Sequence, residues 1–123
     1  MAKQILIIDD DEELCDGIAE ILHDEGYCVK NTSDADEAGK LIENCVFDIA
    51  LVDYKMPKLT GVDVLRLIKA KNPATRVFIV SGRPFIEKLL EDEKVAHLVA
   101  GVISKPFDCQ ELLERILENG GKK

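Results

Sequence analysis

Side chains that could act together on a phosphoryl group follow several short apolar runs of this sequence. Asp9 and Asp10 follow the first run, and Asp53 follows the third. Ser81 and Lys105 come at or just after the ends of two later runs. If these runs are parallel strands, their carboxyl ends meet at one edge of a sheet, where ligand sites form. The pattern therefore predicts a site that combines three carboxylates, a hydroxyl and an ammonium group.

That combination indicates a particular chemistry. Carboxylates held together repel one another unless cations intervene, and Mg²⁺ prefers carboxylate, carbonyl and water oxygens. A metal ion and a lysine can neutralise the oxygens of a phosphoryl group during its transfer, and an aspartate can accept that group as an aspartyl phosphate. Each residue alone also has an ordinary role as a helix cap, a turn or a surface charge. Their common position after strands is what favours a joint site.

The elements that must position these residues are five apolar runs that alternate with helical patterns. The strands are expected at 4–8, 27–30, 47–52, 76–80 and 101–103. Because the runs are continuously apolar, they indicate a parallel sheet that is covered on both faces. The predicted fold class is α/β, a doubly wound five-stranded parallel sheet with five helices. The helices are expected at 12–25, 35–45, 62–71 and 84–92, with a last one after an N-cap at Asp108.

Length and composition narrow the classes of protein. A chain of 123 residues is expected to form one domain over 1–119, with a flexible tail or the start of a linker at 120–123. Lys and Arg total 16 against 24 for Asp and Glu, a net charge of −8, which argues against direct contact with nucleic acid. The apolar stretches are only a few residues long, so membrane insertion is not expected.

The N-terminus and the cysteines bear on location. The first residues, MAKQILIIDDD, contain no signal-peptide pattern, which predicts a cytoplasmic protein. None of the four cysteines belongs to a CxxC pair. Their number alone would allow two disulfides, but a reducing cytoplasm favours free thiols.

Four segments then resemble, as a set and in order, the motifs of receiver domains of two-component response regulators, the chemotaxis-regulator-like family. They are ILIIDDDEEL, DIALVDYKMPKLTG, VFIVSG and ISKPF. The resemblance implies a flavodoxin-like receiver fold with strand order 2-1-3-4-5. It also implies a signalling switch that turns over no separate substrate. Its partners would be a sensor histidine kinase or phosphotransfer protein and a downstream effector, and a homodimer is compatible with the family.

Carried over by motif, the resemblance implies a magnesium site around the phosphoacceptor, Asp53. Asp10 and Asp53 would bind Mg²⁺ through their side chains, and Asp9 would hold it through the water shell. The main-chain carbonyl of Lys55 would be a further ligand. The motif does not require Asp11, which we interpret as a favourable charge at a helix N-terminus.

Two further positions are implied to contact the phosphoryl group. Ser81 takes the position of the switch hydroxyl, and Lys105 takes that of the phosphate-contacting lysine. The family usually has a cis peptide bond before the proline that stands here as Pro106.

The sequence departs from the family pattern in places. Val102 occupies a position where the family often has an aromatic residue, so an output by aromatic rotamer is not expected. The interval between Ser81 and Lys105 is slightly long, which assigns extra residues to 91–100. We also expect Lys55 and Arg83, both long cations, to overhang the site and to slow the attack of water on an aspartyl phosphate.

Two alternatives stay open at this point. A small phosphatase of the haloacid-dehalogenase type also uses an aspartate, a hydroxyl, a lysine and Mg²⁺. Its first-strand DxDx(T/V) pattern is only half matched by Asp9-Asp10-Asp11-Glu12-Glu13. The other alternative is a pseudo-receiver, an interaction module without phosphorylation, although every position that phosphorylation needs is filled.

Overall fold

The computed structural model describes residues 3–56, 58 and 60–120, and it confirms the predicted sheet. The five strands are parallel and lie in the order β2-β1-β3-β4-β5. Their bounds are β1 (Gln4–Ile8), β2 (Cys28–Thr32), β3 (Ile49–Asp53), β4 (Arg76–Ser81) and β5 (Gly101–Ser104). The central strand β3 is buried at every position, which is why its residues from Ile49 to Val52 are all apolar.

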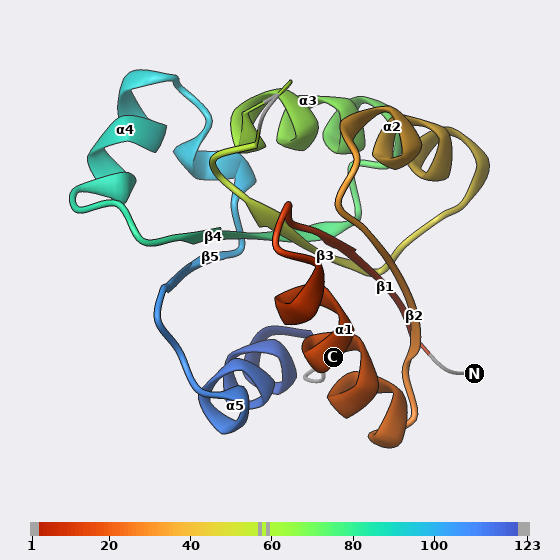
Figure 1. The fold of residues 1–123 in the computed structure, drawn as a ribbon. Helices are drawn as coiled ribbons and strands as arrows, with labels where there is room; N and C mark the ends of the chain where they lie inside the picture. The colour runs from red at the N-terminus through yellow and green to blue at the C-terminus, as the bar shows by residue number, and fades with distance from the viewer. Residues whose placement is uncertain (1–2, 57, 59, 121–123) are drawn as a thin grey trace.

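Helices cover both faces of this sheet (Figure 1). The helices α1 (Glu12–Asp24) and α5 (Cys109–Gly120) lie on one face, while the other face carries α2 (Ala35–Asn44), α3 (Gly61–Lys71) and α4 (Ile86–Asp92). A short 3₁₀ helix, η1 (Ala96–Leu98), lies between α4 and β5. Successive strand residues point to opposite faces, so Ile5 and Ile7 pack beneath α1 and α5, whereas Leu6 and Ile8 pack beneath α2 and α3.

Aspartates fix the starts of three helices, including the one predicted at Asp108. The carboxylate of Asp11 accepts a hydrogen bond from the amide of Leu14 at 3.1 Å. Asp34 and Asp108 accept equivalent bonds at the starts of α2 and α5. These contacts satisfy amide groups that have no partner within the helix. They also fix where the loops that follow β1, β2 and β5 enter their helices.

The structure differs from the sequence expectation mainly at loop boundaries. The helix α4 begins at Ile86 rather than at residue 84, because Phe85 adopts a left-handed conformation with φ 61°. Residues 91–100 contain the end of α4, a turn at Lys94 (φ 62°) and η1. The strand β2 begins one residue later than expected and continues to Thr32.

Three smaller expectations concern the cysteine thiols, the length of the helices and the C-terminal residues. Cys15, Cys28 and Cys45 are free thiols. No described helix is both long enough and apolar enough to cross a membrane. The helix α5 continues to Gly120, and residues 121–123 of the expected tail lie outside the described part of the chain.

Candidate phosphoryl-transfer site

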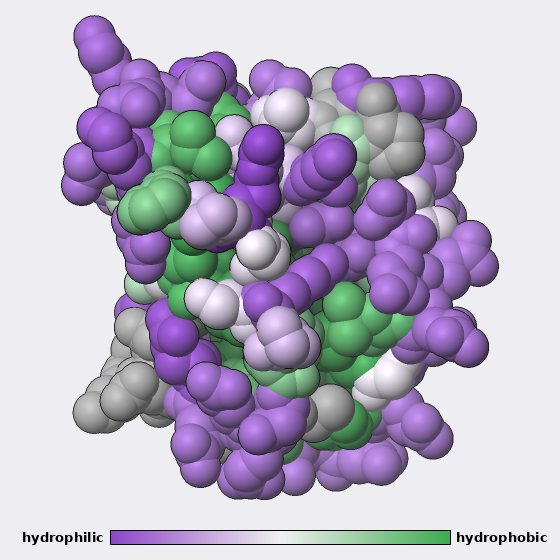
Figure 2. All heavy atoms as spheres, turned by 60° about the vertical axis from the view of Figure 1, so that its left-hand side comes forward, coloured by the Kyte–Doolittle hydropathy of each residue, from purple (hydrophilic) through white to green (hydrophobic). Residues whose placement is uncertain are grey.

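The predicted site residues meet at the edge where the strands end, which Figure 2 turns toward the viewer. Hydrophilic side chains cover most of this face, and apolar side chains show between them. Asp9 follows β1, Asp53 ends β3, and Ser81 ends β4. These three side chains are buried, with exposed fractions of 4%, 6% and 3%. Lys105 follows β5 and is half-buried. The reactive side chains of the site therefore lie at or below the protein surface at this edge of the sheet.

Lys105 joins the strand ends electrostatically. Its Nζ lies 3.0 Å from Oδ2 of Asp9 and 3.6 Å from Oδ1 of Asp53. The backbone positions it, because its amide donates to the carbonyl of Ser81 at 2.8 Å. The peptide bond from Lys105 to Pro106 is cis, as predicted. An ammonium group thus lies between two buried carboxylates.

The acidic side chains of the site are close enough to share one cation. One carboxylate oxygen from each of Asp9, Asp10 and Asp53 lies within 4.8 Å of the other two. Burial, and then the charge of Asp9, raise the pKa of the Asp53 carboxyl to about 6, although Lys105 acts in the opposite direction. Burial on its own would lower the pKa of the Lys105 ammonium, but its hydrogen bond to Asp9 and the two acidic charges raise it. The site therefore favours further positive charge.

The backbone after Asp53 is held in one conformation. The amide of Tyr54 donates to the carbonyl of Val80 at 2.9 Å, and the amide of Gly61 donates to the carbonyl of Tyr54 at 2.6 Å. A Cβ atom at position 61 would lie 2.8 Å from the carbonyl oxygen of Asp53, which is too close for any side chain. The start of α3 is fixed next to this contact by a capping box between Thr60 and Asp63.

The hydroxyl of Ser81 forms a hydrogen bond within its own loop. Its Oγ accepts a hydrogen bond from the amide of Arg83 at 3.0 Å. A hydroxyl that accepts one bond can still donate another, so Ser81 could bond to an oxygen placed above Asp53. Asp9 is held in a similar way, since its Oδ1 accepts from the amide of Asp11 at 3.0 Å.

A cavity of about 600 Å³ opens over these groups. Its lining contains the expected site residues except Asp9, together with Met56 and Gly82, which sequence reasoning did not assign to the site. The full set is Asp10, Asp53, Lys55, Met56, Ser81, Gly82, Arg83 and Lys105. Lys55 and Arg83 are thus at the site, as their positions predicted. Met56 is buried and belongs to the core beneath α2 and α3. Its place in an ordinary-looking loop gave no signal in the sequence.

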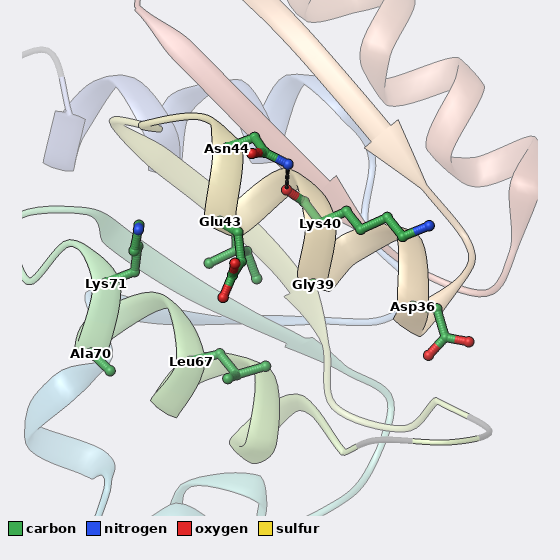
Figure 3. Close-up of a pocket in the computed structure, with 9 residues that line it drawn as sticks. Asp36, Gly39, Lys40, Glu43, Asn44, Leu67, Ala70 and Lys71 are labelled. Carbon is green, nitrogen blue, oxygen red and sulfur yellow. Dashed lines mark hydrogen bonds between the residues drawn. The ribbon is translucent and has the colours of Figure 1, made fainter.

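Val102, the position where the family often has an aromatic residue, does not line the cavity over Asp53. Val102 is half-buried and lines a separate cavity of about 520 Å³ beside α4, with Leu90, Val99 and Arg115. A third cavity, of about 490 Å³, lies between α2 and α3 (Figure 3) and contains none of the predicted site residues. Its rim includes Asn44, whose Nδ2 donates to the carbonyl of Lys40 at 2.8 Å.

Comparison with known proteins establishes the class. The family model for the response regulator receiver domain matches residues 5–117, so the chain belongs to this family. A receiver domain protein from Methanospirillum hungatei, described as CheY-like, superposes with a TM-score of 0.89 at 32% sequence identity. The superposition covers 99% of this chain and 96% of that protein's chain. A response regulator from Burkholderia pseudomallei, whose structure has a phosphorylated aspartic acid, a calcium ion and citrate, shares the fold. It has 24% sequence identity and a TM-score of 0.82, and the superposition covers 98% of this chain and 69% of that protein's chain.

The curated relatives place the domain in two-component signalling. Response regulator MprA of a Mycobacterium species is 32% identical over 119 residues, which is 94% of this chain and 50% of the relative. The chain thus spans about half the length of the curated relatives it matches. Some are named transcriptional regulatory proteins, so the expectation of no nucleic-acid contact gains no support from them. Receiver domains are signalling switches rather than conventional enzymes, and the phosphatase alternative has no support. The boundary at residue 119 stays a prediction.

Proposed function

We propose that this receiver domain is a switch that accepts a phosphoryl group on Asp53 in a Mg²⁺-dependent reaction. The observation that carries the proposal is the arrangement at the strand edge. Asp53 is buried there beside Asp9 and Asp10, and Nζ of Lys105 lies 3.6 Å from its Oδ1. The phosphorylated aspartic acid in the relative from Burkholderia pseudomallei supports the same reaction for this fold.

Mg²⁺ is the ion whose preferences fit the residues present. Asp10 and Asp53 would hold it through their carboxylates, Asp9 through its water shell, and Lys55 through its main-chain carbonyl. These donors are all oxygen atoms, and three carboxylates within 4.8 Å carry more negative charge than Lys105 offsets. When bound, the ion would neutralise phosphoryl oxygens and so favour transfer.

The chain's own residues perform the transfer by position and charge. A carboxylate oxygen of Asp53 attacks the phosphorus of a phosphohistidine on a sensor histidine kinase or phosphotransfer protein. The P–N bond breaks as the O–P bond forms, and its electron pair remains on the imidazole, which takes up a proton. Lys105 donates to a phosphoryl oxygen. Water later attacks the phosphorus, the O–P bond to Asp53 breaks, and inorganic phosphate leaves.

The response to phosphorylation starts from Ser81 and Lys105. The added phosphoryl oxygens accept hydrogen bonds from the hydroxyl and the ammonium, which draws the loops after β3 and β4 toward Asp53. This shifts an equilibrium between two surface states. Because Val102 has no ring to bury or expose, backbone movement between β4 and β5 would carry the signal. The altered surface is read by a downstream effector or by a second copy of the domain.

The location that fits this chemistry is the cytoplasm. The free thiols of Cys15, Cys28 and Cys45 agree with a reducing compartment. The receiver itself, with its net charge of −8, is not proposed to contact nucleic acid. Any such contact would belong to a part of a longer protein outside this sequence.

Phosphorylation with a small phosphodonor and Mg²⁺, followed by intact mass, tests the proposal. Wild type should gain one phosphoryl group and Asp53→Asn none. Asp11→Asn is the matched control, because it removes an acid from the same edge that is not proposed to bind the metal, and it should be labelled like wild type. An unlabelled wild type would favour the pseudo-receiver, and a labelled Asp53→Asn would overturn the assignment of the acceptor.

A further inference from the structure

An arginine and a tyrosine bridge the two loops that flank the acceptor. The guanidinium carbon of Arg83 lies 5.6 Å from the centre of the Tyr54 ring, within the range of a cation–π contact. Tyr54 directly follows Asp53 on the loop after β3. Arg83 lies two residues beyond Ser81, and its amide already donates to the Ser81 hydroxyl. The contact therefore spans the two loops that would move on phosphorylation.

The guanidinium has unused hydrogen-bonding capacity. Arg83 is exposed, and in the part of the chain that the structure describes its side chain makes no hydrogen bond or ion pair. A guanidinium carries five N–H donors in a planar fork that matches two oxygens of a phosphoryl group. Arg83 also lines the cavity over Asp53. The ring of Tyr54 thus contacts a cation at the edge of the site that forms no ion pair with the described carboxylates.

We propose that Arg83 is a further phosphoryl-contacting residue, which the Tyr54 ring holds aside until the acceptor is modified. The inference rests on the proposed role of Asp53. A cation over a ring at an exposed position is a weaker contact than charge-assisted hydrogen bonds to a phosphoryl dianion. When Asp53 carries the phosphoryl group, Arg83 therefore leaves the ring and donates to the phosphoryl oxygens.

The segment that carries Arg83 is exposed from Gly82 to Phe85. At Gly82 an added Cβ would meet only ordinary contacts to Lys105, so no close packing holds the backbone there. Phe85 holds a left-handed φ of 61°, unusual for an aromatic residue, and it is 79% exposed. The hydrogen bond from the Arg83 backbone amide to the Ser81 hydroxyl links that side chain to the backbone of the segment, so a movement of the hydroxyl toward the acceptor draws the segment with it.

The tyrosines of this chain offer a direct signal. The sequence has no tryptophan and two tyrosines, Tyr27 and Tyr54, so a Tyr27→Phe background leaves Tyr54 as the one fluorophore of this class. Beryllofluoride with Mg²⁺ serves as the non-covalent phosphoryl mimic, and fluorine NMR reports its binding independently. In this background the emission of Tyr54 should change when beryllofluoride binds, because the ring loses its cation.

Two variants should then act in opposite directions. Arg83→Gln should bind beryllofluoride about tenfold more weakly, as expected for loss of a charge-assisted hydrogen bond, and its Tyr54 emission should not respond to binding. Tyr54→Leu, which frees Arg83 from the ring, should bind about two- to threefold more tightly. Arg76→Gln, an exposed arginine at the opposite end of β4, is the matched control and should behave like the background.

The outcomes distinguish a failure of the proposed role of Arg83 from a failure of the proposed phosphorylation of Asp53. A bound fluoride resonance in Arg83→Gln with unchanged affinity and an unchanged Tyr54 response would overturn the role of Arg83 alone. Weaker binding in Tyr54→Leu would overturn the holding role of the ring. Absence of a bound resonance in the background protein would overturn the proposed function, and the inference with it.

Discussion

A neutral side chain at position 53 should make the metal-free protein more stable. Burial and the charge of Asp9 raise the pKa of Asp53 from 3.8 to about 6 in the folded chain, so ionising this carboxyl opposes folding. One pKa unit corresponds to about 1.4 kcal/mol, which sets a ceiling of about 3 kcal/mol on the effect. We expect Asp53→Asn to raise the free energy of unfolding by about 1–3 kcal/mol at pH 8 in a metal chelator.

The dependence on pH follows from the same two values. The unfolded chain releases this proton near pH 3.8 and the folded chain near pH 6. Between them the folded state binds more protons, so this group lowers the stability of wild type as the pH rises. Below about pH 4 the carboxyl is protonated in both states and the advantage of Asp53→Asn disappears. Above about pH 6 the advantage is complete.

Urea unfolding at several pH values, followed by circular dichroism, measures the difference. Asp16→Asn is the matched control, because Asp16 is an exposed carboxylate in α1 whose loss should change stability by less than about 0.5 kcal/mol. Added Mg²⁺ should stabilise wild type more than Asp53→Asn and narrow the gap. The reasoning is refuted if Asp53→Asn is no more stable than wild type at pH 8, or if its advantage is the same at pH 4.5.

Two further predictions concern the loops around the acceptor. Gly61→Ala should cost about 1–3 kcal/mol in urea unfolding, because its Cβ would lie 2.8 Å from backbone atoms, whereas Gly39→Ala, with open space around it, should be neutral or stabilising. An equal loss in both would contradict the steric argument. The double variant Lys55→Asn, Arg83→Glu should lose its phosphoryl group several-fold faster than wild type, because two cations no longer hinder the attacking water. An unchanged rate of phosphate release would refute this.

The central part of the site could be predicted because it depends on local sequence and one topological rule. Asp9, Asp53 and Ser81 each follow an apolar run, and such runs become covered parallel strands. Once the strands are parallel, their carboxyl ends meet, and residues far apart in the chain become neighbours. Lys105 needed the motif as well, since a lysine after a short strand is an ordinary surface residue by itself. The distances of 3.0 and 3.6 Å to its two carboxylates required the structure.

The features that escaped prediction depend on packing between loops. No periodicity relates Tyr54 to Arg83, whose contact arises only because the loops after β3 and β4 lie side by side. The left-handed conformation of Phe85 shortened α4 at its start, although neither Phe nor the preceding Pro84 is a usual signal for it. Helix and strand interiors repeat a pattern, whereas these loops satisfy constraints from several elements at once.

The charges of the site also explain why Lys105 alone would not stabilise a phosphoryl group on Asp53 well. The ammonium group of Lys105 lies closer to Asp9 than to Asp53, so its positive charge is divided between the two carboxylates. The pKa of Asp53 therefore remains raised in the metal-free site. Phosphorylation would add a dianion above a floor that already holds the carboxylates of Asp9 and Asp10. Electrostatic balance then requires positive charge beyond Lys105. Mg²⁺ held by the carboxylates would supply part of it, and Arg83, on the exposed loop after β4, would supply more.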